Sequence, residues 1–294
     1  NIMKIIRNLP GPLLIFLGAL SLSFGGLIVK SFEGATLWQI LFWRSLFFSL
    51  TVLAFLIISY KKKTLKAFYD SGLPGFIGGI ILSFGFCGYV FAMYNTTVAN
   101  TNFIISLQIL FLAIFGYVFL KEKINAVTLT SIVLAMTGVL VMVGNSLSPG
   151  EFSGNLAAFT MPITFAVLIM IVRKFPTVDM VPAQFIAGVS SCLIGFVLST
   201  KIMISPNDIF LGFLAGFFQV GFGFIFITIG ARTTPSAMVG IIMLSESVLG
   251  PIWAFLFVSE RPSAFALIGG AIILSAVLLQ FYSLLNRPKK SVSH

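Results

Sequence analysis

Histidine, acidic side chains and cysteine are all scarce in this sequence. Its 294 residues include one histidine, at position 294, and only eight Asp and Glu residues together. A catalytic constellation or a metal site built on these side chains is therefore not expected, and no cofactor is predicted. The two cysteines, Cys87 and Cys192, lie inside apolar runs, so we interpret them as reduced packing residues rather than disulfide partners.

Charge of either sign is also low. Charged residues make up 9% of the chain, whereas a soluble domain carries about 25%, and hydrophobic residues reach 58%. This imbalance predicts a membrane protein. The net charge of +10 does not indicate a nucleic-acid partner, because the basic residues fall in short clusters between apolar runs. The sequence also lacks a glycine-rich loop leading to Lys and Ser or Thr, so no ATP site is expected.

Long apolar runs recur along the whole chain, each close to the length of about 20 residues that a membrane-spanning helix needs. The first exceeds the apolar region of a signal peptide, so we interpret it as an uncleaved span. The sequence therefore predicts an all-α membrane protein with ten transmembrane helices. The predicted spans are 12–31, 37–59, 72–94, 97–119, 126–144, 154–172, 182–200, 208–230, 236–258 and 264–284.

The distribution of Lys and Arg predicts the orientation of these spans. With a cytoplasmic N-terminus, only Lys30, Lys201 and Arg261 flank spans on the outer side. The bias predicts that both termini are cytoplasmic, and we attribute these charges to orientation alone. The fourteen basic residues on the cytoplasmic side are Lys4, Arg7, Lys61, Lys62, Lys63, Lys66, Lys121, Lys123, Arg173, Lys174, Arg232, Arg287, Lys289 and Lys290.

The two halves of the chain resemble each other. A shift of 138 positions places SFGF at 83–86 on GFGF at 221–224. The halves, residues 1–144 and 145–294, each hold five predicted spans, and because five is odd the second half crosses the membrane in the opposite sense. Inverted repeats of this kind are typical of secondary transporters, in which alternating access exposes a site near the midplane.

Several longer stretches point to a known family. They are ALSLSFGGLIVKSF, FWRSLFFSL, AMYNTTVANTNFIISLQILFLAIFGYVFLKEKI and SAMVGIIMLSESVLGPIWAFLFVSER. With them the sequence resembles the drug/metabolite transporter superfamily, EamA type, over nearly its whole length. The resemblance implies a ten-helix bundle that moves small polar or amphipathic metabolites, often amino acids or their relatives, across a bacterial inner membrane.

One departure from the family concerns helix hinges. Family members usually carry a proline in the middle of the fourth and ninth spans, where this sequence has Ile109 and Ser247. A proline hinge is therefore not expected at these positions, although Pro251 offers one a turn later in the ninth span.

Glu246 is an acidic residue at the centre of the ninth predicted span, and the 138-residue shift places it on Gln108 in the fourth. A charged side chain at the centre of a span costs about 2.5–3.5 kcal/mol, so such residues face a partner or a water-filled cavity. Three alternatives stay open. Glu246 is protonated, pairs with a cation of the protein, or binds a cationic group of the substrate; a role in proton coupling belongs to the first.

Arg44 stands in the apolar run LFWRSLFFSL, residues 41–50. Its place in the second span puts it about 10 Å below the outer surface, short of the midplane. Either the side chain extends back to the interface, where Trp38 and Trp43 anchor that surface, or it faces inward and binds a carboxylate through two hydrogen bonds. The resemblance favours the second, because family members often keep an arginine here.

Arg44 and Glu246 together suggest a site for a zwitterion such as an amino acid or a betaine, with cation–π contacts to aromatic rings. A direct pair between them would instead indicate a gate or a structural bridge. Weaker candidates for the same site are Gln108, Tyr89, Asn102, Gln219, Trp253 and Trp43, and Ser21 and Ser23 are expected only to bond their own helix.

Two further features of the sequence are interpreted as structural. Glu122 and Glu260, equivalent under the shift, are expected to cap the following helices rather than to bind substrate. Small-residue pairs, Gly75 with Gly79 and Gly212 with Gly216, predict close helix packing inside the bundle, with a dimer contact as the alternative.

The leading hypothesis is a secondary transporter of a small metabolite in the lipid bilayer, monomeric or dimeric, with protons as a candidate coupling ion. Exporters of other metabolites or drugs form the first alternative. A membrane enzyme is a second class, disfavoured by the missing catalytic constellation, and a channel or scaffold is the third.

Overall fold

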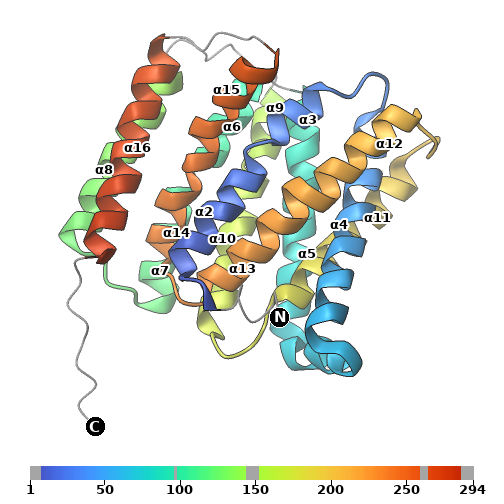
Figure 1. The fold of residues 1–294 in the computed structure, drawn as a ribbon, viewed down its shortest axis with the longest axis horizontal. Coiled ribbons are helices and arrows are strands. Elements are labelled where there is room, and N and C mark those ends of the chain that lie inside the picture. The colour runs from blue at the N-terminus through green and yellow to red at the C-terminus, as the bar shows by residue number, and fades with distance from the viewer. Residues whose placement is uncertain (1–7, 96–97, 144–151, 259–263, 286–294) are drawn as a thin grey trace.

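A computed structural model describes residues 8–95, 98–143, 152–258 and 264–285, and this described part of the chain folds into helices with no β-strand (Figure 1). The predicted all-α class is therefore confirmed. The boundary expected between the two halves, near residue 145, lies outside the described residues. The helices are α2 (Gly11–Leu22), α3 (Gly25–Lys30), α4 (Leu37–Tyr60), α5 (Thr64–Asn95), α6 (Val98–Ser106), α7 (Gln108–Leu120), α8 (Ala126–Val143), α9 (Phe152–Ala158), α10 (Thr160–Lys174), α11 (Val181–Leu198), α12 (Pro206–Phe213), α13 (Gly223–Ala231), α14 (Ser236–Met243), α15 (Ser245–Val258) and α16 (Ala264–Leu285).

Within the residues that the structure describes, five continuous apolar segments have the length that crossing a membrane requires. They are Gly11–Val29, Leu37–Asn95, Ser153–Lys174, Val181–Leu198 and Pro206–Ala231. The longest contains two helices, because the backbone turns at Lys61, whose φ of 51° ends α4. Shorter apolar helices cover Ile104–Leu120, Ala126–Val141, Ser236–Gly250 and Leu267–Ser283. These findings support a multi-pass protein, and the count of ten spans stays a prediction.

Local sequence signals explain where several helices begin and end. At the start of α4, Gln39 Oε1 accepts a 2.8 Å hydrogen bond from the Thr36 N–H, which forms half of a capping box. Ser205 Oγ accepts from the Asp208 N–H at 3.1 Å and caps α12. At the other end of the bundle, Lys121 adopts a left-handed conformation that stops α7.

Two of the predicted spans are interrupted at equivalent points without any proline. Between α6 and α7, the N–H of Leu107 donates to Ile104 O at 3.1 Å. Between α14 and α15, the N–H of Leu244 donates in the same way to Ile241 O at 3.2 Å. Bonds to the third preceding residue mark a turn of 3₁₀-helix, which often accompanies a hinge in a longer helix. These two spans are therefore not continuous helices, although no proline hinge is expected at Ile109 or Ser247.

The spans at the start of each half are interrupted as well. Ser23 and Phe24 separate α2 from α3, and Phe159 separates α9 from α10. The eighth predicted span changes its winding instead, because residues Leu214–Phe222 form a π-helix, η2, between α12 and α13. Interrupted helices and π-turns free backbone groups in the middle of a bundle, where ligands are often bound.

Contacts between the helices recur in equivalent pairs across the two halves. Helix α8 packs on α16 and stands at one side of the bundle, and α4 packs on α11. The pair α10 and α5 has its counterpart in α2 and α13, and α11 with α5 has its counterpart in α4 with η2. The main apolar core lies between these inner helices, with fully buried Phe48, Phe86, Phe165 and Phe224 at its centre.

Candidate functional site

The backbone around Arg44 is fixed by close packing between α4 and the eighth span. A methyl group placed on Gly216 of η2 would overlap the Arg44 carbonyl oxygen and come within 2.7 Å of the Phe48 nitrogen. At Gly212 it would lie 2.9 Å from Trp43 Cβ. Gly79 plays the equivalent part in the first half, where it lies against the Ala183 carbonyl of α11. The small-residue pairs thus serve packing within the bundle, as expected.

The Arg44 side chain lies inside the bundle rather than at its surface. It is 5% exposed, and its guanidinium carbon lies 5.0 Å from the centre of the Tyr89 ring and 5.5 Å from that of Phe86. Both distances suit cation–π contact. Its Nη1 atom is buried and has no hydrogen-bond partner. A buried guanidinium donor without an acceptor is costly, so this atom is available to an anionic ligand.

Glu246 is the second residue of α15, directly after the interruption at Leu244. It is partly buried and lies close enough to Arg44 and Tyr89 to interact with both electrostatically. Arg44 and Glu246, both within the described part of the chain, nevertheless form no ion pair, which would require an N···O distance of 4 Å or less. The direct pair considered from the sequence is therefore absent from this conformation.

Trp253 and Gln219 meet at the interruption between α2 and α3. The indole N–H of Trp253 donates to Ser23 Oγ at 2.8 Å, and its ring stacks on Phe24 with centres 4.6 Å apart. Gln219 Nε2 donates to the Leu22 carbonyl at 3.4 Å. Ser23 also bonds its own helix, donating to Leu20 O at 2.6 Å, but the expectation that it does only this is wrong, because it accepts from Trp253 as well.

Gly25 connects this interruption to Tyr89. A methyl group at Gly25 would come within 2.6 Å of Gln219 Nε2 and 3.3 Å of the Tyr89 hydroxyl. Residues from five different predicted spans therefore gather in one region. We call this set the central cluster: Ser23, Arg44, Tyr89, Gln219, Glu246 and Trp253.

A second contact joins the two helices that are interrupted without proline. The hydroxyls of Ser106, the last residue of α6, and Ser247 of α15 lie 3.0 Å apart. Gln108 is buried and opens α7 just beyond the same interruption. The sequence paired Gln108 with Glu246, and the structure places each just after the interruption of its own span.

Three of the predicted site residues do not join the central cluster: Gln108, Trp43 and Asn102. Trp43 donates its indole N–H to the Ile202 carbonyl at 2.9 Å, and so holds the connection that follows α11. Asn102 of α6 is exposed, and its carbonyl accepts from Ser106 Oγ at 2.8 Å. Sequence reasoning missed Phe24, Phe86 and Ser106. A polar serine inside an apolar predicted span is the one signal that could have indicated Ser106.

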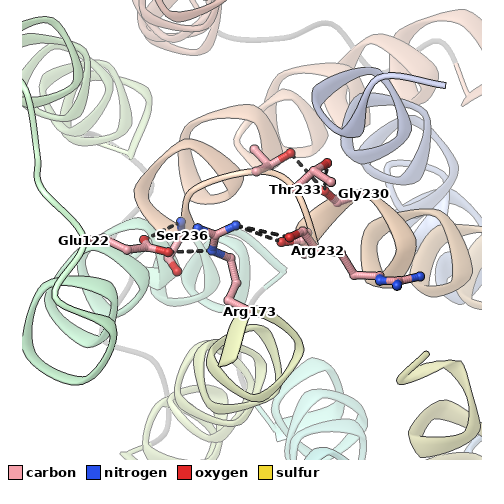
Figure 2. A network of polar contacts seen from close by, with 8 residues as sticks. Glu122, Arg173, Gly230, Arg232, Thr233 and Ser236 are labelled. Carbon is pink, nitrogen blue, oxygen red and sulfur yellow. Dashed lines mark hydrogen bonds and ion pairs between the residues drawn. The ribbon is translucent and has the colours of Figure 1, made fainter. Parts of the chain in front are cut away.

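A separate polar network holds helix ends together at the opposite end of the bundle from α3 and α9 (Figure 2). Glu122 Oε1 pairs with Arg173 Nε at 2.5 Å, and its Oε2 accepts from the Ser236 N–H at 2.8 Å. Arg173 Nη1 also donates to the carbonyls of Ala231 and Arg232, at 3.5 and 3.4 Å. Glu122 thus has a structural role, as expected, but it caps α14 rather than the following helix α8, where Asn125 accepts from the Thr128 N–H instead. Its counterpart Glu260 lies outside the described residues.

Comparison with known proteins identifies the family. The sequence model of the EamA-like transporter family matches residues 9–144 and again residues 148–282. This chain belongs to the EamA-like transporter family. The resemblance to the drug/metabolite transporter superfamily is thereby confirmed, and the chain is a multi-pass membrane protein of a transport family.

Relatives of this EamA-like chain agree at the level of class and fold. An uncharacterized transporter of Methanothermobacter thermautotrophicus is 28% identical over 207 residues, which cover 64% of this chain and 58% of the relative. The match thus spans less than two thirds of that relative's length. A protein of known crystal structure superposes with a TM-score of 0.77 over 94% of this chain and 99% of its own, at 17% identity, which shows a shared fold alone.

Proposed function

We propose that this EamA-like protein is a secondary transporter whose substrate is a small zwitterion, such as an amino acid or a betaine. The observation that carries the proposal is the buried Arg44 guanidinium, whose Nη1 has no partner although aromatic rings and Glu246 surround it. Ten spans in two inverted halves would give alternating access to this region. The paired helix contacts support that symmetry.

The carboxylate of the substrate is assigned to Arg44. A guanidinium presents donors in a rigid planar fork that matches two carboxylate oxygens. Tyr89 and Phe86 hold the guanidinium through their ring faces and leave its Nη1 donor uncommitted. The described residues supply Arg44 with no acidic partner within 4 Å, which supports the assignment of the substrate carboxylate to this side chain.

The cationic group of the substrate is assigned to Glu246 and the nearby aromatic rings. Among the groups that act electrostatically on Arg44, Glu246 supplies the carboxyl group, and Trp253 and Phe24 stack where the first span is interrupted. A quaternary or primary ammonium gains from both a carboxylate and aromatic faces. Gln219 and Tyr89 complete the polar lining, with Gln108 as a further candidate.

The placement of the protein in the cell follows from charge. The bias of Lys and Arg supports cytoplasmic termini. We also propose that the protein resides in a bacterial inner membrane and is monomeric, with a dimer as the alternative.

A matched set of ligands tests the substrate class. Purified protein is heated with glycine betaine, with choline, which lacks the carboxylate, and with the isostere of betaine in which carbon replaces the quaternary nitrogen; amino acids form a parallel series. A substrate raises the unfolding temperature by mass action. We expect a shift only with ligands that carry both charges. An equal rise of the unfolding temperature with choline would show that Arg44 does not bind the substrate carboxylate. An equal rise with the isostere would show that Glu246 does not bind the cationic group.

Transport itself is tested in proteoliposomes. Saturable uptake that accelerates when unlabelled substrate is trapped inside is expected of an alternating-access carrier. Uptake without saturation would indicate a channel, and chemical conversion of the ligand would indicate a membrane enzyme.

A proton role for Glu246 is a second proposal about the same reaction. Glu246→Gln removes the titratable carboxyl but keeps its size, so uptake by this variant is expected to fall and to lose its dependence on pH. Wild-type rates with an unchanged pH profile would exclude proton coupling through this residue.

A further inference from the structure

A cavity of 510 Å³ opens at the end of the bundle where α4 gives way to α5. Three basic side chains line it: Lys63, Lys66 and Arg232. None of these side chains belongs to the central cluster, and Arg232 takes part in the network around Glu122 only through its backbone carbonyl. The general excess of Lys and Arg at this end of the bundle is explained by the orientation of the protein in the membrane. A cavity lined by three cations from two distant parts of the chain is a more specific feature.

The first two turns of α5 form a separate surface helix. The backbone leaves helical geometry at Lys61, with φ of 51°, and again at Gly72, with φ of 54°. Between them, Ala67 is buried and Phe68 packs edge-on against Phe185 of α11, with ring centres 5.4 Å apart. One face of this helix is therefore docked firmly on the bundle.

The other two faces of this helix differ in character. Lys63, Lys66 and Asp70 recur at spacings of three and four residues and line the cavity. Leu65 and Tyr69 lie on the adjoining face and are 83% and 85% exposed. An apolar stripe that is almost fully exposed, next to a basic hollow, matches the arrangement of a helix lying in a membrane interface.

Two acidic residues, Asp70 and Asp179, also line the cavity, but the three basic side chains outnumber them and its net charge stays positive. Asp179 already accepts from the Tyr60 hydroxyl at 2.5 Å and from the Val181 N–H at 3.0 Å. Asp70 stands one turn after Lys66 on the same helix. Arg232 is held in place by a 2.8 Å bond from its Nε to the Pro176 carbonyl.

From this arrangement we infer that the cavity binds the headgroup of an anionic phospholipid. The phosphate meets Lys63, Lys66 and Arg232, and the acyl chains run along Leu65 and Tyr69 into the bilayer. Basic pockets beside membrane helices recognise anionic lipids through this combination of charge and apolar contact. The site is distinct from the proposed substrate site and does not depend on it.

Thermal unfolding in a neutral detergent tests the inference, with phosphatidylglycerol, phosphatidylcholine or inorganic phosphate added. We expect phosphatidylglycerol to raise the unfolding temperature and the other two to leave it unchanged. In the double variant Lys63→Gln with Lys66→Gln, phosphatidylglycerol should bind about thirtyfold more weakly, because each lysine near an anionic lipid contributes about fivefold. All these side chains are exposed, so the variant should fold.

The matched control is Lys123→Gln with Lys174→Gln, which removes the same charge from exposed positions outside the cavity. Its response to phosphatidylglycerol should equal that of the wild type, and an equal loss would overturn the inference in favour of general attraction. An equal shift with phosphatidylcholine would also overturn it, as would an equal shift with inorganic phosphate, which would indicate a free-anion site. Replacing Leu65 and Tyr69 by Gln should lower the affinity for phosphatidylglycerol; unchanged affinity would contradict the path assigned to the acyl chains.

Discussion

Two arginines in this protein, Arg173 and Arg44, have opposite hydrogen-bonding environments. Arg173 lies at the end of α10, where Glu122 and the carbonyls of Ala231 and Arg232 satisfy its donors. Arg44 lies deep in the bundle with aromatic rings around it and no acceptor for its Nη1. The guanidinium is thus bonded through Nε and Nη1 at one end of the molecule, whereas in the interior its Nη1 has no partner.

The difference separates stability from function. A satisfied ion pair at a junction of three helix ends holds those ends together, and its loss leaves an unpaired partner. An unsatisfied buried donor lowers stability, and a protein retains one where a ligand supplies the missing bond. The comparison therefore assigns holding helix ends to Arg173 and binding to Arg44, and each assignment can be tested by substitution.

The largest effect is expected from Arg44→Lys on ligand binding. An ammonium retains the charge but not the planar fork, so the affinity for a zwitterion should fall by about thirtyfold or more, in line with about 2–5 kcal/mol for a buried charged hydrogen-bonded pair. Ligand-induced shifts of the unfolding temperature measure this loss. The unfolding temperature without ligand should change little.

Arg173→Lys is the control for that experiment. It should leave the affinity for the zwitterion near the wild-type value and lower the unfolding temperature instead. If both variants lost affinity equally, the contrast between the two arginines would carry no functional meaning.

Next in size is the effect of Glu122→Ala on stability. The substitution removes the partner of Arg173 and the cap of the Ser236 N–H, so unfolding should cost about 1–3 kcal/mol less. Thermal unfolding without ligand measures it, and Glu122→Gln, which keeps a cap, should lose less. The exposed neighbour Lys123 provides the control through Lys123→Ala. An unchanged midpoint for Glu122→Ala would show that this network holds nothing.

A smaller effect is expected where two interrupted helices touch. Ser247→Ala removes the 3.0 Å contact with Ser106, which is worth about 1 kcal/mol. A double-mutant cycle with Ser106→Ala should show that the two losses do not add. Ser275→Ala, an exposed serine bonded only to its own helix, serves as the control. Additive losses would mean that the two interruptions are not joined through these hydroxyls.

An effect of similar size is expected from Trp253→Phe. The variant keeps a ring that can stack on Phe24 but loses the 2.8 Å bond to Ser23, so stability should fall by about 0.5–1.5 kcal/mol. Binding of a zwitterion should persist, because the aromatic face remains. If Trp253→Phe lowered the affinity more than Arg44→Lys does, the main binding residue would lie on α15 rather than on α4.

Sequence reasoning reached a large part of this fold and a smaller part of its site. Composition and hydrophobic run length predicted the all-helical class, and the motifs predicted the family, which the family model confirmed. The sequence predicts Arg44, Tyr89, Gln219, Glu246 and Trp253 as site residues, and the structure gathers them. Trp43 was named too, but its indole N–H bonds the connection after α11, a contact 159 residues away in sequence that no local pattern indicates.

The helix interruptions show why the rest was not predictable. Without prolines at Ile109 and Ser247, the sequence offers no clear reason for a break, yet the two spans turn at leucines, Leu107 and Leu244, that lie one position from equivalence. Apolar side chains neither favour nor forbid a 3₁₀ turn by themselves. Packing between helices from the two halves decides whether such a turn forms.

The sequence alone determined that this protein is helical, membrane-embedded and duplicated, because composition, run length and internal similarity are properties of the chain itself. Tertiary structure alone decided which of its arginines is satisfied and which is left open. A hydrogen bond needs its partner within about 3 Å, and the groups that meet Arg173, as well as those that fail to meet Arg44, come from distant parts of the sequence.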